Sequence, residues 1–135
     1  MSQTLPLLRG LVLLVTFVTV CNAAGPNAQK KREAAYQATL LSYSDLLKPG
    51  MTRKYVEDYL RSKGAIVQQL CCVEEKSALA DLLKVGTQKH PWYCEEHNVY
   101  IAFQFVAIEP HKPWEAYDSD TLKSIAIFHR PEGCL

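Results

Sequence analysis

Residues 46–64 read LLKPGMTRKYVEDYLRSKG and carry the clearest fold signals of the chain. Lys48-Pro49-Gly50 ends whatever helix precedes it, because proline cannot continue a helix and glycine permits a reversal. Thr52 is a favourable N-cap for a helix over Arg53–Lys63, and Gly64 occupies the usual position just after a helix C-terminus. The stretch therefore predicts one helix set between two reversals of the chain.

A second helix is expected in front of this stretch. Tyr36, Leu40, Tyr43 and Leu47 recur at intervals of three and four residues, which forms one apolar stripe on a helix. The preceding residues are polar and basic. We therefore expect a linker over 24–33 and a single domain over 34–135.

Downstream of Gly64 the apolar pattern changes to that of strands and loops. Val99, Ile101, Phe103 and Phe105 alternate with other residues, as in a strand with two different faces. The expected elements are a strand over 65–73, a weaker helix over 74–85, a loop over 86–97, strands over 98–108 and 122–130, and a turn-rich link over 110–120. Together they predict an α+β fold: two N-terminal helices packed on a three-stranded antiparallel meander, with a helical and loop insertion between strands one and two. The strand over 98–108 should lie in the centre.

The N-terminus has the pattern of a secretory signal peptide. Met1–Gly10 carries one basic residue, Leu11–Val20 is apolar, and small residues follow. This predicts a signal peptide over 1–23 that is cleaved after Ala23. The apolar run is shorter than the roughly 18 residues that a membrane span requires, so no span is expected after cleavage. The alternative is lipidation at Cys21, which is disfavoured because lipoprotein signals usually place Gly or Ala, rather than valine, before that cysteine.

The composition excludes several classes of partner. The chain has 15 basic and 14 acidic residues, and removal of the signal peptide takes away one basic residue and no acidic one. A net charge near zero gives no electrostatic basis for binding nucleic acid or an anionic membrane. We expect an extracytoplasmic protein, periplasmic or secreted, that has no cofactor and a protein partner in the cell envelope.

Four cysteines remain after signal removal. Cys71, Cys72, Cys94 and Cys134 form an even set in an exported domain, so disulfides are expected. In a three-stranded meander all four would lie at one edge of the sheet. Because adjacent residues of a strand point to opposite faces, we expect either Cys71 or Cys72 to bond Cys94 and the other to bond Cys134. A bond between the neighbours Cys71 and Cys72 is the least expected arrangement.

The alternatives to disulfides are metal binding and catalysis. Cys94 and His97 have a ligand-like spacing and His129 is expected near the same edge, so these three residues are the runner-up zinc set. A Cys94–His97 or Cys94–His129 pair could also form a nucleophilic site. The sequence has no nucleophile elbow, phosphate-binding glycine loop or His-Glu-x-x-His motif. We therefore expect no enzyme.

Aromatic residues in the turn-rich segments are the candidate contact residues. Trp92 and Tyr93 follow Pro91, and Trp114 and Tyr117 lie in the second link. Tryptophan and tyrosine dominate interface hot spots, which favours a protein contact at Trp114 and Tyr117. Trp92, next to Cys94, is expected to cover part of the domain instead.

The segment Leu46–Val56 resembles the signature of the small outer-membrane-assembly lipoproteins (SmpA/OmlA, BamE-like), which is Gly-Met-Thr, two or three residues, Val and then Leu. The β-lactamase-inhibitor-protein architecture is similar to theirs. The resemblance implies two helices on a three-stranded antiparallel sheet and an interaction or structural role in the envelope. An inhibitor-like module that binds a secreted enzyme is the alternative function, and a small thiol or zinc-dependent enzyme is the second alternative.

Cleavage after Ala23 can be tested by expressing the full chain in an exporting host and measuring the intact mass of the product. We expect a chain that begins at Ala24, because small residues at the −1 and −3 positions suit signal peptidase. A chain that begins at an acylated Cys21 would show lipidation instead. A product that retains Met1 would contradict export through this signal.

Overall fold

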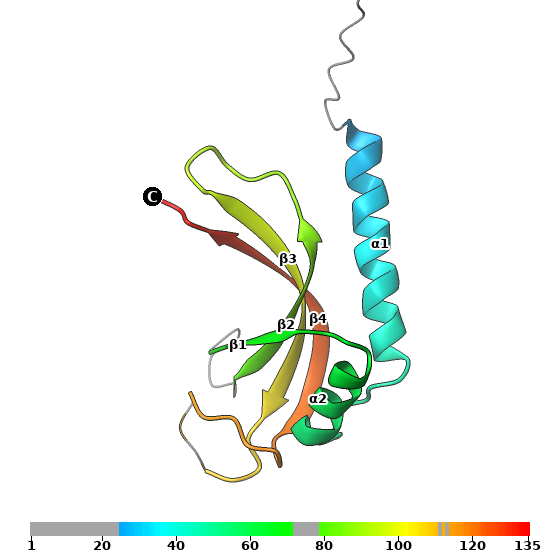
Figure 1. The fold of residues 1–135 in the computed structure, drawn as a ribbon, viewed down its shortest axis with the longest axis vertical. Helices are drawn as coiled ribbons and strands as arrows, with labels where there is room; N and C mark the ends of the chain where they lie inside the picture. The colour runs from blue at the N-terminus through cyan, green and yellow to red at the C-terminus, as the bar shows by residue number, and fades with distance from the viewer. Residues whose placement is uncertain (1–24, 72–78, 111, 113) are drawn as a thin grey trace, which may run out of the picture.

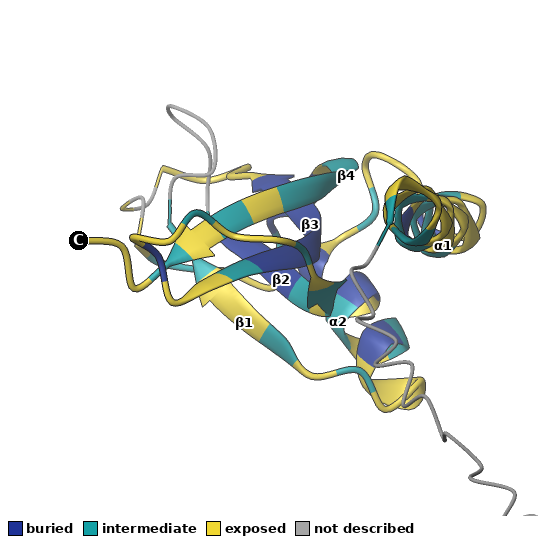
Figure 2. Ribbon diagram, turned by 90° about the horizontal axis from the view of Figure 1, so that it is seen from above, coloured by how far each residue is buried: buried dark blue, intermediate teal, exposed yellow. Residues whose placement is uncertain are grey.

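The computed structural model describes residues 25–71, 79–110, 112 and 114–135. Its elements are two helices and four strands: α1 (Pro26–Ser44), α2 (Arg53–Ser62), β1 (Val67–Leu70), β2 (Ala80–Thr87), β3 (Glu96–Val106) and β4 (Thr121–Glu132). The strands form one antiparallel sheet in the order β1-β2-β3-β4, and both helices lie against the same face of it (Figures 1 and 2). The α+β class is confirmed, but the sheet has four strands and not three. The expected signal peptide over 1–23, with Cys21 and Ala23, lies outside the described residues.

The additional strand is β2, at a place where the sequence pattern predicts a helix over 74–85. Leu82 packs with Tyr100 on one face of the sheet, whereas Leu83 and Val85 pack against the core on the other face. A strand that buries apolar residues on both faces shows no alternation, so its run of leucines resembles a buried helix. Residues 74–78 of the expected helix lie outside the described part of the chain.

Both helices form where the sequence predicts them, with small shifts at their ends. The Thr52 hydroxyl accepts a hydrogen bond from the backbone N–H of Tyr55 at 3.3 Å, as an N-cap does. Gly64, with a φ of +71°, adopts the left-handed conformation that ends a helix. The segment expected as a linker over 24–33 is instead helical from Pro26, because proline is tolerated in the first turn and the following residues favour helix.

The main core lies between the helices and the sheet. Phe103 and Phe105 of β3 are fully buried there, with Val56 and Leu60 of α2 beneath them. β3 pairs with β2 on one side and β4 on the other, so the expected interior position of this strand is confirmed. Among the described residues, no helix combines the length and the apolarity that crossing a membrane requires.

Tyr36 of α1 lies close to the backbone of β2 at Gly86. The Tyr36 hydroxyl donates a hydrogen bond to the backbone oxygen of Thr87 at 2.9 Å, and the ring lies over the backbone where β2 bulges between Lys84 and Gly86. A Cβ atom on Gly86 would lie 2.7 Å from Cε1 and 2.9 Å from Cζ of the Tyr36 ring. Only glycine allows this approach of helix to strand.

Replacing Gly86 with alanine should lower the free energy of unfolding by about 1–3 kcal/mol, because the new methyl group overpacks the contact with Tyr36. Urea denaturation measures the effect. The control is the same substitution in a Tyr36→Leu background, where the ring is absent and the cost of Gly86→Ala should fall to near zero. An equal cost in both backgrounds would show that the ring contact is not the cause.

Candidate functional site

Cys94 and Cys134 form a disulfide with an S–S distance of 2.06 Å and a Cα–Cα distance of 3.9 Å. The expected connectivity, in which these two cysteines bond Cys71 and Cys72, is therefore wrong. Cys71 is also disulfide-bonded, and Cys72 lies outside the described residues.

The reason for the error is the number of strands. In a three-stranded meander the end of the first strand lies beside the start of the long central one. The additional strand β2 reverses the direction once more: Leu70 of β1 pairs with Ala80, and the neighbouring Asp81 pairs with Phe103 near the end of β3. Cys71 thus lies at one end of the sheet, and the Cys94–Cys134 disulfide lies at the other.

The alternative zinc site and the alternative nucleophilic pairs both require Cys94, and this cysteine is part of the disulfide. A thiolate is the form of cysteine that binds metal or attacks a substrate, and Cys94 has no free thiol when it is bonded to Cys134. The His97 and His129 rings do lie together, with centroids 6.1 Å apart. Within the described ranges, no group of three His, Cys, Asp or Glu side chains is placed to hold a metal ion.

An exposed apolar surface lies beside the disulfide. We call it the hairpin-end patch, and it consists of Trp92, Tyr93 and Leu135. Trp92 is 90% exposed, Tyr93 is 45% exposed and Leu135 is fully exposed. The Leu135 N–H donates to the backbone oxygen of Tyr93 at 2.9 Å, and the two aromatic rings meet edge to face at 5.8 Å. Contrary to expectation, Trp92 does not cover the domain but points into solvent. A cavity of about 380 Å³ lies between these residues and Gly133.

The other two candidate aromatics, Trp114 and Tyr117, lie in the connection between β3 and β4, at the opposite end of those strands (Figure 1). Trp114 is 65% exposed and Tyr117 is 39% exposed. The Lys112 ammonium lies 5.7 Å from the Trp114 ring centroid, and the Tyr117 hydroxyl donates to Glu115 at 3.3 Å. The four aromatics therefore form two separate surfaces rather than one.

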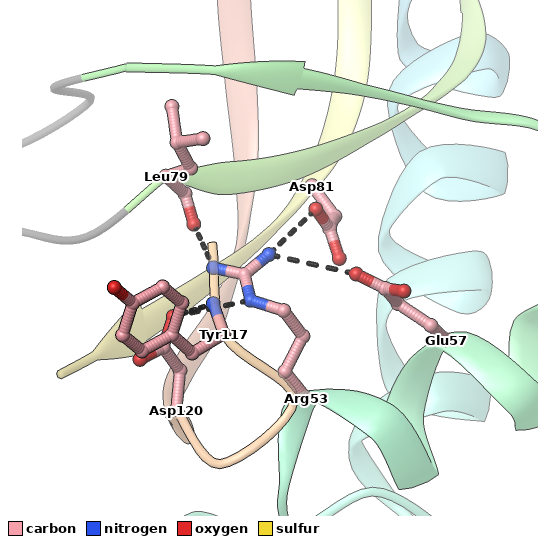
Figure 3. Close-up of polar contacts among 6 residues, drawn as sticks. All are labelled: Arg53, Glu57, Leu79, Asp81, Tyr117 and Asp120. Atoms are coloured by element: carbon pink, nitrogen blue, oxygen red, sulfur yellow. Dashed lines mark hydrogen bonds and ion pairs between the residues drawn. The ribbon is translucent and has the colours of Figure 1, made fainter. Parts of the chain in front are cut away.

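A buried charge centre is the feature that sequence reasoning missed. The Arg53 guanidinium is only 1% exposed and bonds Asp81 of β2 at 2.8 Å and Asp120, just before β4, at 3.4 Å (Figure 3). It also donates to the backbone oxygen of Leu79 and stacks 3.9 Å from the centroid of the Phe105 ring. One cation thus joins α2, β2, β3 and the start of β4.

The centre holds more negative than positive charge. Asp81 and Asp120 are fully buried, and Glu57 of α2 comes within 3.7 Å of the same guanidinium. Burial raises the pKa of Asp81 to about 7; the Arg53 charge opposes this rise and the Glu57 carboxylate adds to it. Oδ2 of Asp81 has no hydrogen-bond partner among the described residues. Asp81 is thus protonated more easily than an ordinary aspartate.

A weak signal of this centre is present in the sequence. Arg53 lies in the first turn of α2, where the helix dipole favours anions, and no acidic residue is present there. An arginine at this position needs an external partner. Asp81 lies between Ala80 and Leu82 in an otherwise apolar run. The reason for an acidic residue at this position becomes visible only in the fold, where β2 places Asp81 against Arg53.

Asp81 should make the stability of the fold depend on pH near neutrality. Its pKa is about 7 when folded and 3.8 in the ordinary state, so the stabilisation from binding a proton is complete below pH 3.8 and is lost as the pH rises through 7. The melting temperature should therefore be higher at about pH 5.5 than at about pH 8 by several degrees, since 1 kcal/mol corresponds to about 4–8 °C in a small domain. Differential scanning calorimetry measures this.

Two variants isolate the aspartate from other titrating groups. Asp81→Asn keeps an acceptor for Arg53 and cannot ionise, so its melting temperature should change less between the two pH values. Asp118→Asn, at an exposed aspartate, should keep the wild-type difference. An Asp81→Asn protein with the wild-type pH dependence would show that another group is responsible.

Comparison with known proteins identifies no relative of this chain. No family model, curated protein or solved structure matches it. The resemblance to the BamE-like lipoproteins therefore stays a prediction, and a functional argument has to start from the two aromatic surfaces and the charge centre.

Proposed function

We propose that the chain is an exported, non-enzymatic domain that binds a protein partner in the cell envelope through the hairpin-end patch. The observation that carries the proposal is the 90% exposure of Trp92 beside Tyr93, which is 45% exposed. An exposed tryptophan does not contribute the large favourable free energy that burial of its ring would give. Such a side chain is typical of a surface that a partner covers.

The base under this patch is rigid. The Cys94–Cys134 disulfide holds both segments together, and Glu95 adds backbone hydrogen bonds to Glu132 and Gly133 at 3.1 and 3.3 Å. A surface that is already ordered loses less conformational entropy when a partner binds. This supports a preformed contact site over a mobile one.

The same disulfide agrees with export and leaves Cys94 without a free thiol. Structural disulfides persist outside the reducing cytosol, which agrees with the signal pattern at residues 1–23. A thiol enzyme or a zinc site built on Cys94 would require this bond to be reduced. The proposal therefore uses the cysteines only as structural links.

Replacing Trp92 with alanine should weaken partner binding about tenfold or more while leaving stability almost unchanged, because the ring makes hot-spot contacts but is exposed in the free domain. The partner is first captured with a photo-crosslinking residue at position 92 in an envelope fraction and identified by mass spectrometry. Calorimetry then compares its affinity for the wild-type and Trp92→Ala proteins, and a melting curve reports stability.

Two further variants keep the test specific. A crosslinker at Ile66, which lies just before β1 and is 86% exposed, should give no adduct of the same protein. The double variant Trp114→Ala/Tyr117→Ala should bind as the wild type does. If Trp92→Ala binds normally and the double variant does not, the contact lies at the β3–β4 connection and the proposal is wrong.

A further inference from the structure

A groove lies on the face of the sheet opposite the helices. The proposed function does not use this groove. Its volume is about 620 Å³, within the range of small-molecule sites. It is lined by the segment Gly64–Gln68 on one side, and by Leu82, Lys84, Glu96, Asn98, Tyr100 and Glu132 of the other three strands. We call this the sheet groove.

Two polar residues of β3 are buried in the groove. Asn98 is 1% exposed and Tyr100 is 3% exposed. The Asn98 side-chain N–H donates to Glu96 at 2.9 Å, and the Tyr100 hydroxyl donates to Glu132 at 2.9 Å. The bond to a carboxylate fixes the orientation of the amide, so Oδ1 of Asn98 is the atom left without a partner among the described residues. A buried acceptor without a donor is costly and calls for a donor group.

Two glutamates of the neighbouring strands β3 and β4 line the groove. Glu96 and Glu132 are direct cross-strand partners, an arrangement in which like charges repel. Each carboxylate has one cationic partner: Lys84 lies 3.5 Å from Glu96, and Arg130 lies 3.6 Å from Glu132. Asn98 and Lys84 hold the pKa of Glu96 below its usual range. Of the charged side chains that line the groove, Glu96 and Glu132 are acidic and Lys84 is basic, so the lining carries a net negative charge.

From this arrangement we propose that the sheet groove binds a small protonated amine that carries an apolar or aromatic group. The ammonium group lies between Glu96 and Glu132 and donates hydrogen bonds to these two carboxylates. The apolar group packs against Leu82 and the start of β1. This site is independent of the hairpin-end patch, so either proposal can fail without the other.

The test uses three probes of similar size and different charge: phenethylamine, its neutral N-acetyl derivative and 3-phenylpropionate. Titrations are followed by ¹H–¹⁵N NMR of the oxidised full-length mature protein. Phenethylamine should shift the amide resonances of Glu96, Asn98 and Tyr100 and bind at least tenfold more tightly than either other probe. Equal binding of all three, or no binding of the amine, overturns the proposal.

The double variant Glu96→Gln/Glu132→Gln should lose at least tenfold in affinity for phenethylamine. Glutamine keeps an acceptor for Asn98 and Tyr100, so the fold is preserved, and its NMR spectrum shows whether that holds. The matched control is Glu95→Gln, since Glu95 precedes Glu96 but does not line the sheet groove. If Glu95→Gln weakens binding as much as the double variant does, the loss comes from the change in overall charge. The proposal that the amine binds between Glu96 and Glu132 is then wrong.

Discussion

The buried guanidinium of Arg53 is the interaction on which the arrangement of helices and sheet depends. It bonds Asp81 and Asp120, which lie 28 and 67 residues away in the sequence. Around it, the backbone of residues 50–53 runs beside residues 120–122, with hydrogen bonds from Gly50 to Leu122 and from Leu122 to Met51 at 2.8 and 2.7 Å. A buried charge that loses one partner costs about 3–5 kcal/mol. The centre is therefore complete only when α2, β2 and the start of β4 are all in place, which disfavours partly assembled states.

The sequence predicts best those elements whose ends or faces are marked by residues close together in the chain. Thr52 and Gly64 mark the ends of α2, and the alternation of Ile101, Phe103 and Phe105 marks β3. β2 was not predicted because its first residues pack apolar side chains on both faces of the sheet. Leu82 and Leu83 contact different layers, so no period of two is visible. One missing strand was enough to bring all four cysteines to the same edge in the expected fold and to give the wrong partner to Cys94.

The candidate sites also differ in how far the sequence predicts them. Trp92 and Tyr93 are visible in the sequence as aromatics of a proline-containing loop, although their exposure is a property of the fold. The sheet groove could not be predicted, since it depends on the register that places Glu96 opposite Glu132. The charge centre is intermediate: Arg53 is unusual in the first turn of a helix, but its partners come from strands whose pairing the sequence does not reveal.

The Cys94–Cys134 disulfide has a further consequence for how copies of the chain can associate. β3 and β4 are joined at one end by residues 107–120 and at the other by the disulfide, so they belong to one closed covalent ring. β4 is an edge strand, the kind of element that neighbouring molecules exchange in domain swapping. The Cα atoms of Cys134, which follows β4, and of Cys94, which precedes β3, lie 3.9 Å apart, so β4 alone cannot leave β3 of its own chain while this bond is intact. Oxidation thus opposes the exchange of β4 between copies of the chain.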